Sequence, residues 1–122
     1  MHASIVRIID DAEGGSLFVD AAEPLVPASV ASPASALGAA EPRPARETRF
    51  IGAPAGWSSP LHPAPSVRWI IVMRGVVEVG TSDGAFRRFG PGTAIHLEDT
   101  TGAGHSTRVL PGDDWVAMIV FT

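Results

Sequence analysis

The chain has 122 residues, a formal net charge of −4 and 45% apolar residues, which describes a single globular domain rather than a disordered segment. The acidic balance argues against nucleic acid or an anionic membrane as a partner. The absence of cysteine, lysine and tyrosine excludes disulfides, thiol nucleophiles, zinc–thiolate sites, lysine Schiff bases and tyrosine acids.

The N-terminal part alternates short apolar runs with turns and then changes in composition. Residues 3–9 and 16–20 predict short strands, separated by the turn sequence DAEGG. From residue 21 to 47 the chain is rich in Ala, Pro and Ser, and its prolines prevent any long helix. We therefore expect residues 1–46 to form two strands and an extended arm packed on a main domain of residues 47–122.

The first apolar run is too short for a signal peptide, and no apolar segment approaches the roughly 20 residues of a membrane helix. A cytoplasmic location is the expectation that follows.

The second part of the chain is a succession of strands and tight turns. Strands are predicted for ETRFIGA, SVRWIIVMRG, VVEVG, AFRRF, TAIHLED, STRVL and WVAMIVFT. Asp83-Gly84 is a hairpin turn signal. Turn signals that recur about every 8–12 residues are typical of an all-β sandwich or barrel. Several strands are apolar on both faces, which indicates a cover on each side and, on the outside, a second copy in a homodimer.

Two motifs in this part resemble those of the cupins. The first cupin motif is Gly, five residues, His-x-His, three or four residues, Glu, six residues, Gly. Here Gly56, His62 and Gly75 match, while Ala64 replaces the second histidine and Arg68 replaces the glutamate.

The second cupin motif is matched by Gly92, Gly102 and His105, whereas Thr100 and Val109 replace its proline and asparagine. The string DGAFRRFGPGTAIHLEDTTGAGH is also similar to a group of small single-domain bacterial cupins. This resemblance implies an all-β double-stranded β-helix of the jelly-roll type. It does not select an activity, because cupins include oxygenases, isomerases, cyclases, lyases and binding proteins.

The substitutions alter the site that the resemblance implies. A typical cupin metal centre has three histidines and a glutamate, and the alignment leaves His62 and His105. Arg68 would place a permanent positive charge where an anionic ligand belongs. We therefore expect no cofactor; the alternative is a divalent metal on His62 and His105, completed by Asp99, Glu98 or His96.

Alternation along the first motif puts Arg68, Ile70 and Val72 on one face, and the resemblance implies that this face lines the interior. A buried guanidinium needs a partner, either Asp99 or Glu98 of the protein or an oxygen of a substrate; the remaining alternative is that Arg68 reaches solvent at the mouth of the interior. The predicted catalytic residues are His62, His105 and Arg68. The predicted substrate-binding residues are Arg68, Trp57, Ile70, Val72, His96, Thr107 and Val109.

This set suits proton transfer beside a carbonyl group of a small molecule, without a redox step. Polyketide cyclases are among the cupins that the sequence resembles, which implies an isomerase, cyclase or lyase of specialised metabolism. The alternatives are a metal-dependent cupin with rearranged ligands and a non-catalytic small-molecule-binding module.

Overall fold

The computed structural model describes residues 1–122 as an all-β protein without a helix. The strands are β1 (His2–Asp10), β2 (Ser16–Pro24), β3 (Val26–Ala28), β4 (Leu37–Ala39), β5 (Glu47–Ala53), β6 (Ser58–His62), β7 (Arg68–Arg74), β8 (Val77–Thr81), β9 (Phe86–Phe89), β10 (Ala94–Leu97), β11 (His105–Val109) and β12 (Trp115–Phe121). No helix is therefore present that could cross a membrane.

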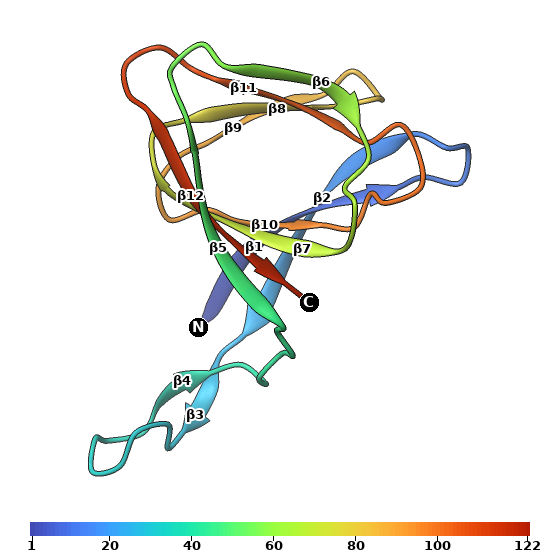
Figure 1. The fold of residues 1–122 in the computed structure, drawn as a ribbon. Coiled ribbons are helices and arrows are strands. Elements are labelled where there is room, and N and C mark those ends of the chain that lie inside the picture. Colours follow the sequence, from blue (N-terminus) through green and yellow to red (C-terminus); the bar gives the residue numbers. More distant parts are fainter.

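Two sheets of unequal size face each other (Figure 1). The larger has six strands in the order β2-β1-β10-β7-β12-β5, and the smaller has four in the order β6-β11-β8-β9. Neighbouring strands are antiparallel except for β1 and β10, which run parallel. The all-β prediction is confirmed, and each of the two sheets is open at its edges.

The core lies between the sheets because the strands alternate in the expected way. In β12, Trp115, Ala117 and Ile119 are buried, and the residues between them face outward. They join a cluster of buried apolar side chains that both sheets supply, among them Val79 and Val109 of the smaller sheet. Burial of these side chains is the main stabilising contribution to the fold.

The hairpin predicted at Asp83-Gly84 is present between β8 and β9. The amide of Thr81 donates to the carbonyl of Ala85, and Gly84 has a φ of 89°. Glycine adopts such a left-handed conformation without the steric cost that a Cβ brings. The turn thus fixes the register that places Val79 in the core.

Strand β6 was not expected from the sequence, and it changes the position of His62. Residues 58–62 form β6, an edge strand of the smaller sheet, although Pro60 lies within it. Arg68 begins β7 in the larger sheet. His62 and Arg68 therefore lie on opposite sheets and not along a single strand.

The N-terminal part differs from the expected arm. Strands β1 and β2 are integral to the larger sheet, while β3 and β4 form a separate hairpin that projects away from both sheets (Figure 1). Val26, Val30 and Leu37 of this segment are at least half exposed. The segment is rich in Ala, Pro and Ser and has little apolar surface with which to pack on the main body, which explains the difference.

Candidate functional site

A cavity of about 180 Å³ lies between the two sheets. It is lined by Ile8, Ile51, Trp57, His62, Ala64, Pro65, Arg68, Ile70, Val77, Val79, Ile95, Leu97, His105, Thr107, Trp115 and Ile119. Its wall is mainly apolar, and its only ionisable lining groups are two imidazoles and one guanidinium. An apolar recess with a few polar groups is the usual form of a small-molecule site.

His105 is held by a fully buried carboxylate. Its Nδ1 atom lies 2.6 Å from Oδ2 of Asp99, and the two residues are 7% and 0% exposed. A carboxylate accepts hydrogen bonds, so Nδ1 carries the proton of the neutral ring and Nε2 is left as an acceptor. The other carboxylate oxygen of Asp99 has no hydrogen-bond partner. Asp99 therefore sets both the orientation and the tautomer of His105.

His62 presents a second imidazole to the same cavity. It is paired with His105 in the register of β6 and β11, and the two ring centroids are 5.4 Å apart. Its Nδ1 atom lies 3.1 Å from the carbonyl oxygen of Pro63, so here too Nδ1 is the donor in the neutral ring. His62 is exposed, whereas His105 is buried. The pair thus comprises one ring at the rim and one inside.

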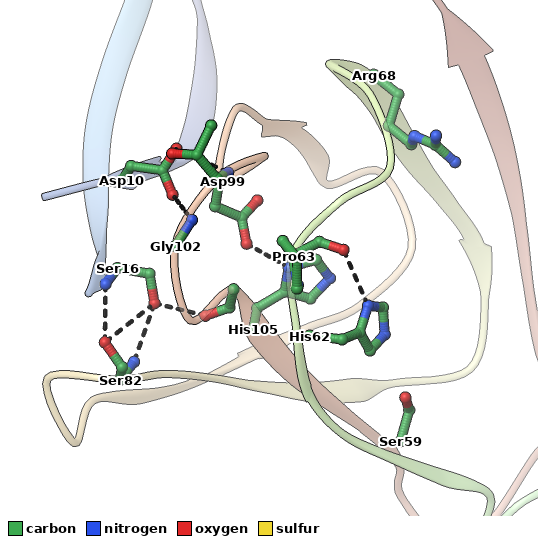
Figure 2. A network of polar contacts seen from close by, with 12 residues as sticks. Asp10, Ser16, Ser59, His62, Pro63, Arg68, Ser82, Asp99, Gly102 and His105 are labelled. Carbon is green, nitrogen blue, oxygen red and sulfur yellow. Dashed lines mark hydrogen bonds and ion pairs between the residues drawn. The ribbon is translucent and has the colours of Figure 1, made fainter. Parts of the chain in front are cut away.

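The loop before His105 is fastened by the turn between β1 and β2 (Figure 2). Asp10 accepts hydrogen bonds from the amides of Thr101 and Gly102 and from the Thr101 hydroxyl, and this hydroxyl contact is the main cause of a lowered Asp10 pKa. The Ser16 hydroxyl donates to the carbonyl of Gly104 at 2.5 Å. The N-terminal strands therefore hold the backbone that positions His105.

Arg68 lines the opposite wall without the carboxylate partner expected for it. Its Nε and Nη2 atoms donate to the carbonyl and hydroxyl oxygens of Ser66 at 3.0 and 2.9 Å. Its guanidinium lies over the ring of Phe121, with Cζ 4.9 Å from the centroid. Burial lowers the pKa of Arg68 because desolvation disfavours its charged form.

The two carboxylates considered as partners of Arg68 are engaged elsewhere, so the alternative of a pair within the protein is not realised. Glu98 accepts two hydrogen bonds from Arg7 at 2.7 and 2.8 Å, and Asp99 binds His105. Seven of the nine arginines form an ion pair; only the exposed Arg49 and the half-buried Arg68 do not. Arg68 is thus an unpaired cation in the cavity wall.

The other predicted site residues lie in the cavity wall, in the core or, in the case of His96, on the outer face of the larger sheet. Trp57, Ile70 and Thr107 line the cavity with the residues above. Val72 and Val109 belong to the core, where they are 1% and 0% exposed, and they do not line the cavity.

His96, predicted among the substrate-binding residues, lies on the face of the larger sheet opposite to the cavity. Its neighbours Ile95 and Leu97 take the inward positions, because successive side chains of a strand alternate. Its Nδ1 atom is 2.8 Å from Oε2 of Glu98, and its ring packs against that of Trp69, with centroids 4.3 Å apart and the ring planes tilted by 42°. His96 and Glu98 are therefore removed from the set that could act in the cavity.

The residues present do not fit the metal centre of the typical cupin. Ala64 and Arg68, the residues that the resemblance aligns with the second histidine and the glutamate of that centre, both lie in the cavity wall. Asp99 is the one carboxylate near His105, and it binds the ring nitrogen as an orienting partner. Among His, Cys, Asp and Glu side chains, no group of three or more is arranged to hold a metal ion.

Comparisons with protein-family models and with curated proteins found no match to this chain.

Proposed function

We propose that this protein is a small cupin-type enzyme that catalyses a non-redox proton transfer on a carbonyl-bearing small molecule, as in an isomerisation, cyclisation or lyase step. The observation that carries the proposal is the buried Asp99–His105 pair beside an apolar cavity with an unpaired guanidinium. The two facing sheets and the positions of both motif histidines in the cavity wall support a cupin-type jelly roll.

His105 supplies the base. Its Nδ1 proton is directed to Asp99, so its Nε2 lone pair can take a proton from a carbon or oxygen atom next to a carbonyl group. Asp99 stabilises the imidazolium that forms, as a carboxylate does in a hydrolase triad. The His105 imidazolium can return this proton from Nε2 to another atom of the substrate. It can instead pass the proton to His62, whose ring centroid is 5.4 Å away and which is open to solvent and can release the proton to water.

The walls of the cavity contribute to the same step. Isoleucine and valine side chains make most of the wall apolar, and apolar surroundings strengthen the electrostatic interactions of a bound molecule. Arg68 is the single permanent cation in the wall and can stabilise a substrate oxygen as negative charge develops on it. Every element of this mechanism is supplied by the chain itself.

Solvent exchange of acidic C–H groups tests the proposal directly. We would incubate the protein in D₂O with phenylpyruvate, acetophenone and 1-phenylbutane-1,3-dione and follow loss of the α-proton signals by NMR. The expected result is exchange of at least one compound well above the buffer rate. His105→Ala should abolish this exchange, because the base is removed, whereas His96→Gln, a histidine on the other face, should retain it.

Three results would count against the proposal. Exchange at the buffer rate for all compounds, with binding retained, would favour a non-catalytic binding module. Exchange that survives His105→Ala would contradict the assigned base. Stoichiometric iron, zinc, manganese or nickel in protein purified without chelator, together with loss of exchange on its removal, would favour a metal-dependent enzyme.

We further propose that the protein is a homodimer that uses the outer face of the larger sheet. Phe50, Met118, Ile71 and Ala94 are register partners on four adjacent strands and face away from the cavity. Phe50 is 70% exposed. A row of apolar side chains on an open sheet face is typical of a contact surface.

A further inference from the structure

The charge of the cavity points to the class of molecule it takes. His62, Arg68 and His105 are its only ionisable lining groups, and no carboxylate lines it. We propose that the cavity binds an apolar, single-ring monocarboxylate, with the carboxylate on Arg68. This inference uses the site of the proposed function but does not require that the bound molecule react there.

The free donors of Arg68 are arranged for a carboxylate. Nε and one Nη2 hydrogen are directed to Ser66, which occupies the side edge of the guanidinium. The Nη1 atom makes no hydrogen bond within the protein, so the end edge, formed by one hydrogen each of Nη1 and Nη2, keeps its donors unused. A carboxylate can bind this edge through both oxygens, whereas a single carbonyl oxygen cannot satisfy both donors as well.

Binding an anion there would also compensate a cost in the free protein. The guanidinium is half-buried, has no ion pair, and is covered by the ring of Phe121 on one face. Partial burial of a cation without a counter-charge is unfavourable, and burial lowers its pKa. A carboxylate ligand supplies the missing charge, whereas a neutral amide or alcohol of the same shape does not.

The size and lining of the cavity limit the rest of the molecule. Its volume is about 180 Å³, below the roughly 300–1,000 Å³ of sites for drug-sized ligands. An apolar protein cavity of about 150 Å³ is large enough to bind benzene. Ile70, Ile95 and Leu97 line it, and their surfaces favour a hydrocarbon ring over a sugar or an amino acid.

The positions of the polar groups separate the anchoring end from the reacting end. Arg68 lies on β7 of the larger sheet, while His62 and His105 lie on β6 and β11 of the smaller one. Figure 2 shows Arg68 apart from the two imidazoles. A bound carboxylate would therefore hold the molecule at one end, leaving a distal carbon or carbonyl group beside the histidines.

A set of matched probes tests this inference. Thermal unfolding would be measured with benzoate, cyclohexanecarboxylate, benzamide and benzyl alcohol, each at equal concentration and constant ionic strength. We expect the two carboxylates to raise Tm and the two neutral compounds to leave it nearly unchanged. Dissociation constants from calorimetry should weaken roughly 10–100-fold for benzoate in Arg68→Gln, the effect of losing one charge-assisted contact.

Arg49→Gln is the matched control, because Arg49 is the other arginine without an ion pair and is exposed. It should bind benzoate as the wild type does. The folded state of Arg68→Gln is checked by its circular dichroism and its Tm without ligand. If Arg68→Gln is unfolded, Arg68→Lys serves instead, since it keeps the charge and loses the two-point geometry, and should bind more weakly.

The outcomes separate this inference from the proposed function. Equal binding of benzoate and benzamide, or benzoate binding unaffected by Arg68→Gln, would overturn the inference even if α-proton exchange were observed. Carboxylate-selective binding with no exchange of any probe would uphold it and reject catalysis. Exchange restricted to neutral ketones would uphold catalysis and reject the anionic ligand.

Discussion

The imidazole of His105 and the carboxylate of Asp99 form a buried pair whose Nδ1 and Oδ2 atoms are 2.6 Å apart. Neither Glu98, the preceding residue, nor Arg68, which was considered as a partner of Asp99, takes part in it. This single contact determines which ring nitrogen of His105 is free.

Replacement of Asp99 by asparagine should move the proton of the neutral His105 ring from Nδ1 to Nε2. The asparagine amide can donate to Nδ1, which moves the proton of the neutral ring to Nε2 and removes the acceptor. We expect ¹⁵N shifts of His105 to report the Nε2–H tautomer, and any proton-transfer rate to fall about 10²–10⁴-fold. A variant that keeps the Nδ1–H tautomer and full activity would contradict the role given to Asp99.

Gly104 precedes His105 in the chain and packs closely against the backbone of His62. It has a φ of 77°, and a Cβ there would overlap the carbonyl group of His62. We expect Gly104→Ala to destabilise the protein by about 3 kcal/mol or more and to alter the NMR signals of both imidazoles.

Gly84→Ala is the control for this prediction, since Gly84 has a φ of 89° with open space around its Cβ position. It should cost only the backbone strain of roughly 1–2 kcal/mol and leave the site unchanged. Equal costs for the two variants in denaturant unfolding would show that the contact with His62 is unimportant.

The Arg7–Glu98 pair should make the free energy of unfolding depend on pH below about pH 5. Hydrogen bonds from Arg7, assisted by those from His96, lower the pKa of Glu98 to about 2. A carboxylate with a lowered folded-state pKa contributes stability above its unfolded pKa of roughly 4.3, and this contribution is lost as pH falls toward 2.

Arg7→Gln should therefore reduce stability at pH 6 and make the curve flatter between pH 5 and 2. The free energy of unfolding at pH 6 should be lower in the variant than in the wild type by on the order of 1 kcal/mol, since a partly solvent-exposed pair is screened. Urea unfolding at several pH values measures it. A pH dependence identical to that of the wild type would show that the pair does not contribute.

The homodimer proposal predicts that charged substitutions disrupt the dimer only on the outer face of the larger sheet. The wild type should have twice the chain mass of 12.7 kDa in light scattering, and Phe50→Asp should give the monomer. Phe86→Asp is the control, because Phe86 is 65% exposed but lies on β9 of the other sheet. A monomeric wild type, or a dimer insensitive to Phe50→Asp, would refute this interface.

Much of the site could be located from residue patterns. The period of two in SVRWIIVMRG separates Arg68 and Ile70 from Trp69, and the structure places the first two in the cavity wall and the third beside His96. Local alternation is a property of the strand itself, so it needs no knowledge of the partner strands.

The sequence did not reveal which carboxylate pairs with which arginine or histidine. Glu98 follows β10, but it meets Arg7 because β1 pairs in parallel with β10, a pairing between segments about 90 residues apart. Asp99 reaches His105 because the loop between them is held by Asp10 and Ser16 of the N-terminal strands. Such contacts depend on sheet order, which local patterns do not contain.

Residue patterns thus predicted most strands and turns, though not β3, β4 or β6, because strand alternation and turn residues are local properties, and the resemblance to the cupin motifs marked His62, His105 and Arg68 as candidates. Tertiary structure decided that the histidines and Arg68 lie on opposing sheets, that His96 faces outward, and that Arg68 has no counter-charge. The reason is physical: alternation separates two faces of a strand, but only packing of the sheets decides which face is enclosed and which charges meet.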